Sequence, residues 1–124
     1  MLSGNLCLVE DLVLRDNVIK ATLHWNAEHA IFAGHFPDQP VVPGVCMMQL
    51  VQECLSGATG KQWQLSSASM IKFLHFIDPR VHQAVSLQVQ LPAEQSESLK
   101  ITASLFNEST VFFKYNAAYR QISV

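Results

Sequence analysis

A histidine and a carboxylate close together in the chain are the residues best suited to acid–base chemistry. His35 lies in a proline-rich stretch, and Glu53 is the only charged residue between Gly44 and Gly60. A carboxylate buried alone among apolar residues costs several kcal/mol unless it is neutral or has a partner. Histidine titrates near neutral pH, and desolvation raises the pKa of a glutamate toward the same range, so such a pair is suited to moving protons. We therefore interpret residues 32–53 as a candidate active site.

The residues after this histidine predict a helix of about four turns that carries the carboxylate. Pro43 suits the first helical position, because a proline there loses no hydrogen bond, and Gly57 or Gly60 is a natural helix end. Most residues between them are apolar, which is typical of a helix wrapped by a larger structure. Gln49 and Glu53 are four residues apart and therefore share one helix face.

The N-terminus of this helix is a candidate binding site for an oxygen that gains negative charge. The amide of Gly44 lies in the first turn, where an N–H group has no acceptor within the helix and faces the positive end of the helix dipole. It could stabilise a carbonyl oxygen during a reaction. Val45 extends the Gln49 face toward this end of the helix.

Composition restricts the domain organisation and the classes of partner. A chain of 124 residues predicts a single domain, residues 1–124, without room for a separate cofactor domain. Hydrophobic residues make up 49% and charged residues 15%, so we expect an oligomer. A net charge of −2 with scattered basic residues argues against nucleic acid as a partner. The chain shows neither a membrane-spanning run nor a signal-peptide pattern, so we expect a cytoplasmic protein without membrane insertion.

The other residues with reactive side chains show no site pattern. Cys7, Cys46 and Cys54 lack metal-ligand spacing, and two helical turns separate the last two, which is too far for a disulfide. Cys46 or Cys54 could act as a nucleophile, although small buried apolar cysteines are commoner. No metal site is predicted. The remaining histidines are interpreted as surface or strand residues: His24, His29, His75 and His82.

Outside the helix, the pattern of apolar residues predicts strands. An opening hairpin consists of Leu6–Leu14 and Val18–Trp25, on either side of a turn-prone trio at residues 15–17. The strands expected after the helix are Trp63–Ile77, Val85–Leu91, Leu99–Phe106 and Val111–Tyr119. Two strands, an irregular loop, a buried helix and four antiparallel strands indicate an α+β fold, with the helix packed on one curved sheet.

The loop and the start of the helix follow a family pattern, F-x-G-H-F-P-G-x-P-x-x-P-G-V. The residues of this chain that match the pattern are Phe32, Gly34, His35, Phe36, Pro37, Pro40, Pro43, Gly44 and Val45. Phe73 and Pro79 keep the six-residue spacing of a later family segment. Through these residues the chain resembles the hotdog-fold 3-hydroxyacyl-[acyl-carrier-protein] dehydratases. The resemblance implies a hotdog fold, in which a curved antiparallel sheet wraps one long central helix, and a dimer that completes the active site.

The resemblance also implies roles for individual residues. His35 would remove the proton next to the thioester carbonyl, and the Gly44 amide would hold the carbonyl oxygen. Residues lining the acyl tunnel would be Val45, Met47, Met48, Val51 and Phe73. The implied protein is a hydro-lyase of fatty-acid-type biosynthesis that forms a 2-enoyl thioester without a cofactor. Its partners would be an acyl carrier protein bearing a 3-hydroxyacyl chain and further copies of itself, as a homodimer or higher even oligomer.

The sequence departs from the family at the general acid. The family's glutamate or aspartate comes fourteen residues after the histidine, and here that residue is Gln49. Glu53 follows one turn later, about 6 Å along the helix axis, a displacement that a glutamate side chain and a bridging water can span.

Two interpretations of this exchange follow. In the one we favour, Glu53 is the general acid and Gln49 orients the 3-hydroxyl group. In the other, Glu53 is structural, and the protein is a noncatalytic subunit that binds acyl thioesters beside an active homologue. A hotdog thioesterase, in which a carboxylate activates water against the thioester, is a further alternative.

Overall fold

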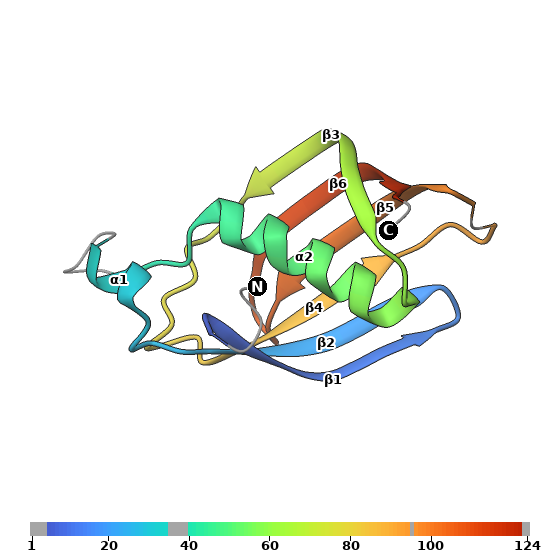
Figure 1. Cartoon of the computed structure of the whole chain (residues 1–124). Helices are drawn as coiled ribbons and strands as arrows, with labels where there is room; N and C mark the ends of the chain where they lie inside the picture. The colour runs from blue at the N-terminus through green and yellow to red at the C-terminus, as the bar shows by residue number, and fades with distance from the viewer. Residues whose placement is uncertain (1–4, 35–39, 95, 123–124) are drawn as a thin grey trace.

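The structure, a computed structural model, describes residues 5–34, 40–94 and 96–122. One long helix lies inside a curved sheet of six strands, as the sequence predicts (Figure 1). The elements in chain order are β1 (Cys7–Arg15), β2 (Val18–Trp25), α1 (Ala30–Gly34), α2 (Gly44–Thr59), β3 (Trp63–Phe73), β4 (Ala84–Gln90), β5 (Ser98–Phe106) and β6 (Val111–Gln121). Among the described residues, no helix is long and apolar enough to span a bilayer.

The opening hairpin forms where the sequence predicts it, and its turn explains why. Asp16 and Asn17 have φ angles of 53° and 65°. Positive φ at both central residues defines a type I′ turn, whose twist matches that of the flanking strands, and Asp and Asn tolerate this conformation better than most residues. Asp11 also has a positive φ, and the pairing register shifts between Glu10 and Val13, so β1 contains a bulge.

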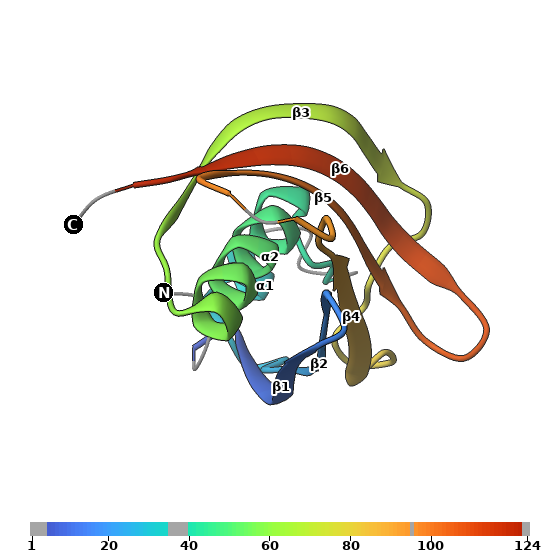
Figure 2. The ribbon, with the colours of Figure 1, turned by 90° about the vertical axis from the view of Figure 1, so that its right-hand side faces the viewer.

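The sheet has the strand order β1-β2-β4-β5-β6-β3, and all neighbouring strands are antiparallel. The strands on either side of α2 in the sequence, β2 and β3, are therefore not neighbours in the sheet. The helix crosses the concave face to carry the chain from one side of the sheet to the opposite edge, and the sheet curves around it (Figure 2). This crossing places the start of α2 beside the end of β3.

The central helix begins and ends close to the predicted residues. Pro43 is the N-cap, with an extended ψ of 144°, and not the first helical residue. Gly60, the C-cap, has a φ of 71°, and its N–H donates to the carbonyl of Ser56. The buried side of the helix consists of Cys46, Met47, Leu50, Val51, Cys54 and Leu55. Val45, in contrast, is 74% exposed, so the sheet leaves one strip of the helix uncovered.

Strand β3 is shorter than predicted, because its last expected residues have other partners. The strand ends at Phe73, and the N–H groups of Leu74 and His75 both donate to the carbonyl of Phe112, at 2.8 and 3.3 Å. Ile77 is fully buried, and its carbonyl accepts from the N–H of Val42 at 2.9 Å. The segment after β3 thus leaves the sheet and pairs with the loop that leads into α2.

The short helix α1 lies in the segment for which the sequence predicts an irregular loop. It begins after a turn in which the Asn26 side chain accepts from the N–H of Glu28, at 3.1 Å. The aromatic ring of Phe32 is buried in the core. Five residues are too few to show a helical repeat in the sequence, which is why the pattern did not reveal this element.

Replacing Gly60 by alanine is expected to lower the free energy of unfolding by about 1 kcal/mol, because a Cβ is unfavourable at positive φ. Urea unfolding followed by circular dichroism measures the change. Gly60→Asn is the matched control and should lose less, because asparagine tolerates the left-handed region. Equal stability of Gly60→Ala and the wild type would contradict the assigned cap.

Candidate functional site

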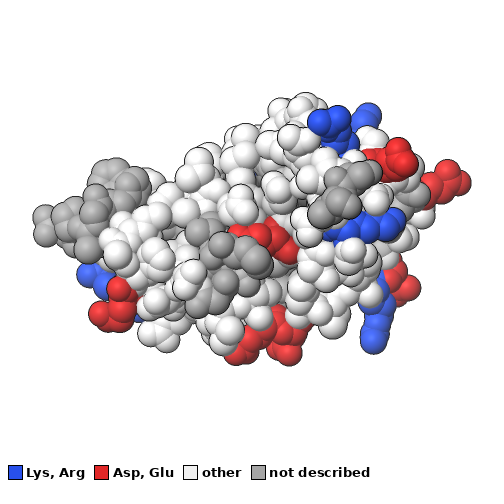
Figure 3. All heavy atoms as spheres, viewed as in Figure 1, with Lys and Arg blue, Asp and Glu red and all other residues white. Residues whose placement is uncertain are grey.

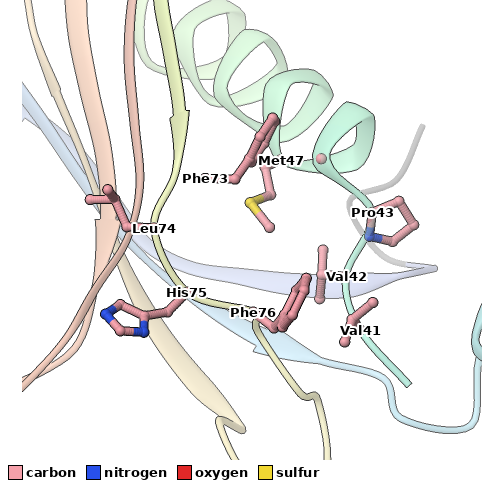
Figure 4. A pocket seen from close by; sticks show the side chains of 9 residues that line it. Val41, Val42, Pro43, Met47, Phe73, Leu74, His75 and Phe76 are labelled. Carbon is pink, nitrogen blue, oxygen red and sulfur yellow. The ribbon is translucent and has the colours of Figure 1, made fainter. Parts of the chain in front are cut away.

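An apolar cavity of about 490 Å³ lies where the start of α2 meets the end of β3 (Figure 4). We call it the Phe73 cavity. Its lining residues are Val41, Val42, Pro43, Gly44, Met47, Phe73, Leu74, His75 and Phe76. In Figure 4 the His75 ring points away from the Phe76 ring, so the side chains that enclose the space are mainly apolar. A cavity of this size and character is suited to a hydrophobic ligand.

Gly44 and Phe73, both predicted to bind substrate, meet in this cavity. A Cβ on Gly44 would lie 2.5 Å from Cζ of Phe73, so only glycine allows the ring to pack against the start of the helix. The Phe73 ring is also stacked on Phe113, with centroids 5.3 Å apart. The first N–H groups of α2 carry the positive end of the helix dipole, so a carbonyl oxygen here would be stabilised as it gains negative charge.

A second, smaller cavity of about 200 Å³ lies between α2 and strands β3 and β6. We call it the tyrosine cavity. Its lining residues are Val45, Met48, Gln49 and Gln52 of α2, Leu65 of β3, and Tyr115 and Tyr119 of β6. Three predicted site residues, Val45, Met48 and Gln49, therefore lie together here. Tyr115 is stacked on Phe113 with centroids 5.5 Å apart, and Phe113 is in turn stacked on Phe73, so one aromatic row leads from one cavity to the other.

Glu53 lies on α2 but is not among the described residues that line either cavity. It is half-buried, and its charge contributes to the raised pKa of the thiols of Cys7 and Cys54. Each step of four residues turns an α-helix by about 40° beyond a full turn, so Val45 and Glu53 point about 80° apart. This rotation explains why Gln49 shares a cavity with Val45 while Glu53 is directed closer to the start of β1.

His35, the predicted base, lies outside the described residues, as do Phe36 and Pro37 of the sequence motif. The residues on either side of this gap are described. Helix α1 ends at Gly34, and the chain is described again from Pro40, a buried residue, onward to the start of α2. The role assigned to His35 therefore stays a prediction.

Three of the other histidines make local contacts. The Nε2 atom of His24 lies 3.2 Å from a carboxylate oxygen of Glu10. The Nδ1 atom of His29 accepts from the N–H of Ile31 at 3.1 Å, and that of His82 accepts from the N–H of Asp78 at 3.0 Å. The fourth, His75, lines the Phe73 cavity; no sequence pattern indicates this position, because only the fold brings His75 near α2.

The cysteines are small buried residues, as the commoner interpretation expects. All three are free, and burial raises the pKa of each thiol, to about 12 for Cys7 and Cys54. A thiol with a raised pKa is a poor nucleophile at neutral pH, which argues against catalysis by Cys46 or Cys54. In the described part of the chain, no group of three or more His, Cys, Asp or Glu residues is placed to hold a metal ion.

Comparisons with known proteins agree with the predicted fold and reaction class. The model of a family described as ApeI-like, ApeI dehydratase, matches residues 12–117. The 3-hydroxyacyl-[acyl-carrier-protein] dehydratase FabZ of Actinobacillus succinogenes is 25% identical over 79 residues, which are 64% of this chain. The match spans about half, 49%, of that relative's length.

Solved structures share the arrangement of strands and helix. One from the dehydratase heterocomplex ApeI:P of Xenorhabdus doucetiae has a TM-score of 0.71 and 20% identity, and the match covers 95% of this chain and 99% of that one. A thioesterase superfamily protein from Shewanella loihica has a TM-score of 0.62 and 11% identity, with 92% and 91% of the two chains covered. At these identities the likeness shows the fold alone. It confirms the predicted α+β hotdog fold.

Gly44→Ala is expected to destabilise the protein by about 1 kcal/mol, because the new methyl group displaces the Phe73 ring from its stack on Phe113. In a Phe73→Ala background the same change should cost little. A double-mutant cycle of unfolding free energies measures the difference, and additive effects of the two substitutions would show that the ring does not pack on Gly44.

Stability is expected to fall in alkaline solution, because the Cys7 and Cys54 thiols have a folded-state pKa of about 12, raised from 9.0. The unfolded chain loses these protons first, so their contribution is complete below about pH 9 and is lost as the pH rises toward 12. Urea unfolding at a series of pH values measures the slope. The matched variant Cys7→Ala/Cys54→Ala should have a shallower slope, and an unchanged slope would contradict the assignment.

Proposed function

Since this chain belongs to the ApeI-like dehydratase family, we propose that it removes water from a 3-hydroxyacyl thioester on an acyl carrier protein and forms the 2-enoyl thioester. One observation carries this proposal: Gly44, at the positive end of α2, opens directly into an apolar cavity. A thioester carbonyl and its attached chain need both features, a hydrogen-bond donor for the oxygen and an apolar surface for the chain.

The proposed reaction is an elimination without a cofactor. His35 takes the proton from the carbon next to the thioester carbonyl, and the electron pair moves onto the carbonyl oxygen, which the Gly44 N–H stabilises. The carbon–oxygen bond at the third carbon then breaks. Glu53 supplies the proton that turns the departing hydroxide into water, directly or through a bridging water, while Gln49 orients the hydroxyl group.

The described surfaces support a dimer that completes this site. Strand β3 is at an edge of the sheet, and β6 is the only strand paired with it in the described chain. Exposed apolar residues lie along this edge and on the neighbouring strip of α2: Val45, Leu65, Ile71 and Phe73. Figure 3 shows that the surface over the first half of α2 and the end of β3 is mostly uncharged.

An edge strand that carries exposed apolar residues is a template for pairing with another chain. We therefore propose a homodimer or higher even oligomer, in which His35 of one copy faces Gln49 and Glu53 of the other. The similar structure from Xenorhabdus doucetiae is named as a dehydratase heterocomplex, ApeI:P, so that protein with a similar fold forms a complex of more than one chain.

A second function is favoured by one observation, the position of the acid. Gln49 lines the tyrosine cavity, whereas Glu53 lines neither of the two cavities in the described structure. If Glu53 does not reach the substrate, the protein would bind acyl thioesters without dehydrating them and would act beside an active homologue. The loss of a positioned acid typically lowers a rate about a hundredfold to ten-thousandfold.

Incubation with a 3-hydroxyacyl carrier thioester, or with the corresponding 2-enoyl thioester, should interconvert the two, because an elimination is reversible. Mass spectrometry of the acyl carrier measures both directions. We expect His35→Ala to lose at least about a hundredfold in rate, because it removes the base. Glu53→Gln should lose a similar factor, and Gln49→Ala should lose less.

The matched control is Glu108→Gln, the same substitution at an exposed residue of the β5–β6 turn, which should keep full activity. Equal rates for the wild type and Glu53→Gln would exclude Glu53 as the acid. Binding of the thioester without any interconversion would instead support the noncatalytic subunit, and release of a free acid would indicate a thioesterase.

A further inference from the structure

The peptide group between Ile77 and Asp78 is hydrogen-bonded on both sides. Its carbonyl oxygen accepts from the N–H of Val42 at 2.9 Å, and its N–H donates to the Nδ1 atom of His82 at 3.0 Å. A short chain of hydrogen bonds therefore runs from the imidazole, through one peptide plane, to the loop that leads into α2. Hydrogen bonds arranged in a chain polarise one another, so each of these two bonds strengthens the other.

The turn formed by residues 78–82 brings the His82 ring to this peptide. The N–H of His82 donates to the carbonyl of Asp78 at 2.7 Å, so residue 82 folds back onto residue 78. The Arg80 guanidinium donates to both carboxylate oxygens of Asp78, at 3.2 and 3.1 Å, within the same turn. The His82 ring lies edge-on to the buried ring of Phe112, with centroids 4.8 Å apart. These contacts leave the imidazole little freedom to turn away from the peptide.

The other end of this chain of hydrogen bonds lies at the wall of the Phe73 cavity. Val42 is buried and lines the cavity together with Phe76, which belongs to the segment after β3 (Figure 4). Pro43 connects Val42 to Gly44, and its ring fixes φ, here at −62°, so a shift of Val42 moves the first turn of α2 with it. The bond from Val42 therefore joins the two segments between which the cavity lies.

Histidine holds this peptide as a hydrogen-bond acceptor. A ring nitrogen that accepts from an N–H group carries no hydrogen of its own, so the ring hydrogen of His82 is on Nε2. A side chain without an acceptor would leave the Asp78 N–H without this partner and would let the peptide plane rotate away from Val42. Another aromatic ring could make the contact with Phe112, so the acceptor is what distinguishes histidine here.

We propose that His82 is a positioning residue of the candidate active site. By accepting from Asp78 it fixes the peptide group that holds Val42. Through Val42 it sets the position of the Gly44 amide at the start of α2. That amide stabilises an oxygen only when it points at it, so a small displacement lowers the rate more than the affinity for the acyl chain. The effect on the rate rests on the proposed function.

Two substitutions at residue 82 separate the acceptor from the ring. His82→Asn keeps an acceptor, because its Oδ1 atom is bonded to Cγ as Nδ1 is in histidine, but it loses the ring. His82→Phe keeps a ring against Phe112 and loses the acceptor. The inference predicts that the asparagine variant is active and the phenylalanine variant is impaired, whereas a role in packing alone predicts the reverse. His24→Phe, the same substitution at a partly exposed histidine of β2, is the control and should behave as the wild type.

Hydrogen exchange of the Val42 amide, followed by NMR, tests the positioning without any substrate. The amides of β4, an inner strand of the sheet, report global unfolding and serve as the reference. Relative to them, the Val42 amide of His82→Phe should exchange about tenfold faster than in the wild type, because the peptide that accepts from it is no longer held. In His82→Asn the relative exchange should stay close to that of the wild type.

Steady-state kinetics with a 3-hydroxyacyl carrier thioester measures the consequence for the proposed reaction. His82→Phe should lower kcat about tenfold and leave KM nearly unchanged, because the acyl chain still fits the cavity while the Gly44 amide is displaced. His82→Asn should keep most of the wild-type kcat.

Equal Val42 exchange in the wild type and His82→Phe, or an increase matched by the β4 amides, would overturn the inference. Equal losses of kcat in the two variants would also overturn it. If Val42 exchanges faster in His82→Phe alone but the wild type dehydrates no 3-hydroxyacyl thioester, the proposed reaction fails and the positioning role stands. If the wild type dehydrates the thioester and His82→Phe does so at the full rate, the reaction stands and the inference fails.

Discussion

The burial of α2 in the concave face of the sheet is the constraint on which the rest of the structure depends. Its apolar side supplies much of the core, and removing those side chains from water is the main favourable contribution to such packing. Because the helix must cross the sheet to do so, β3 comes to the edge opposite β1, and the end of β3 meets the start of α2. The candidate site exists only because of this meeting.

The contact between Gly44 and Phe73 joins that architecture to the proposed chemistry. Glycine lets the Phe73 ring pack against the first turn of the helix, and the same turn offers its amides to a carbonyl oxygen. The aromatic row then continues from Phe73 through Phe113 to Tyr115, so stacked rings connect the walls of the two cavities.

The exchange of Gln49 and Glu53 shows how strongly helix geometry limits a substitution. Along the axis the two residues are only about 6 Å apart, which suggests that an acid could move by one turn. Around the axis, however, Glu53 is rotated further from Val45 than Gln49 is. The charge of Glu53 contributes to the raised pKa of the Cys7 and Cys54 thiols, whereas Gln49 lines the tyrosine cavity. For this reason the two proposed functions, an active dehydratase and a binding subunit, differ in where the Glu53 carboxyl lies and not in whether it is present.

The sequence by itself determined the local structure and the family. The Asp16–Asn17 turn, the α2 boundaries near Pro43 and Gly60, and the strand alternation all depend on neighbouring residues, whose preferences act within a few positions. Gly44 and Phe73 could be named in advance because a family pattern includes them. The tertiary structure alone decided that β3 lies at the far edge, that His75 borders the Phe73 cavity and that Tyr115 meets Tyr119. These contacts join residues on different elements or side chains bent toward each other, and they depend on how the whole sheet curves around the helix, which no local pattern contains.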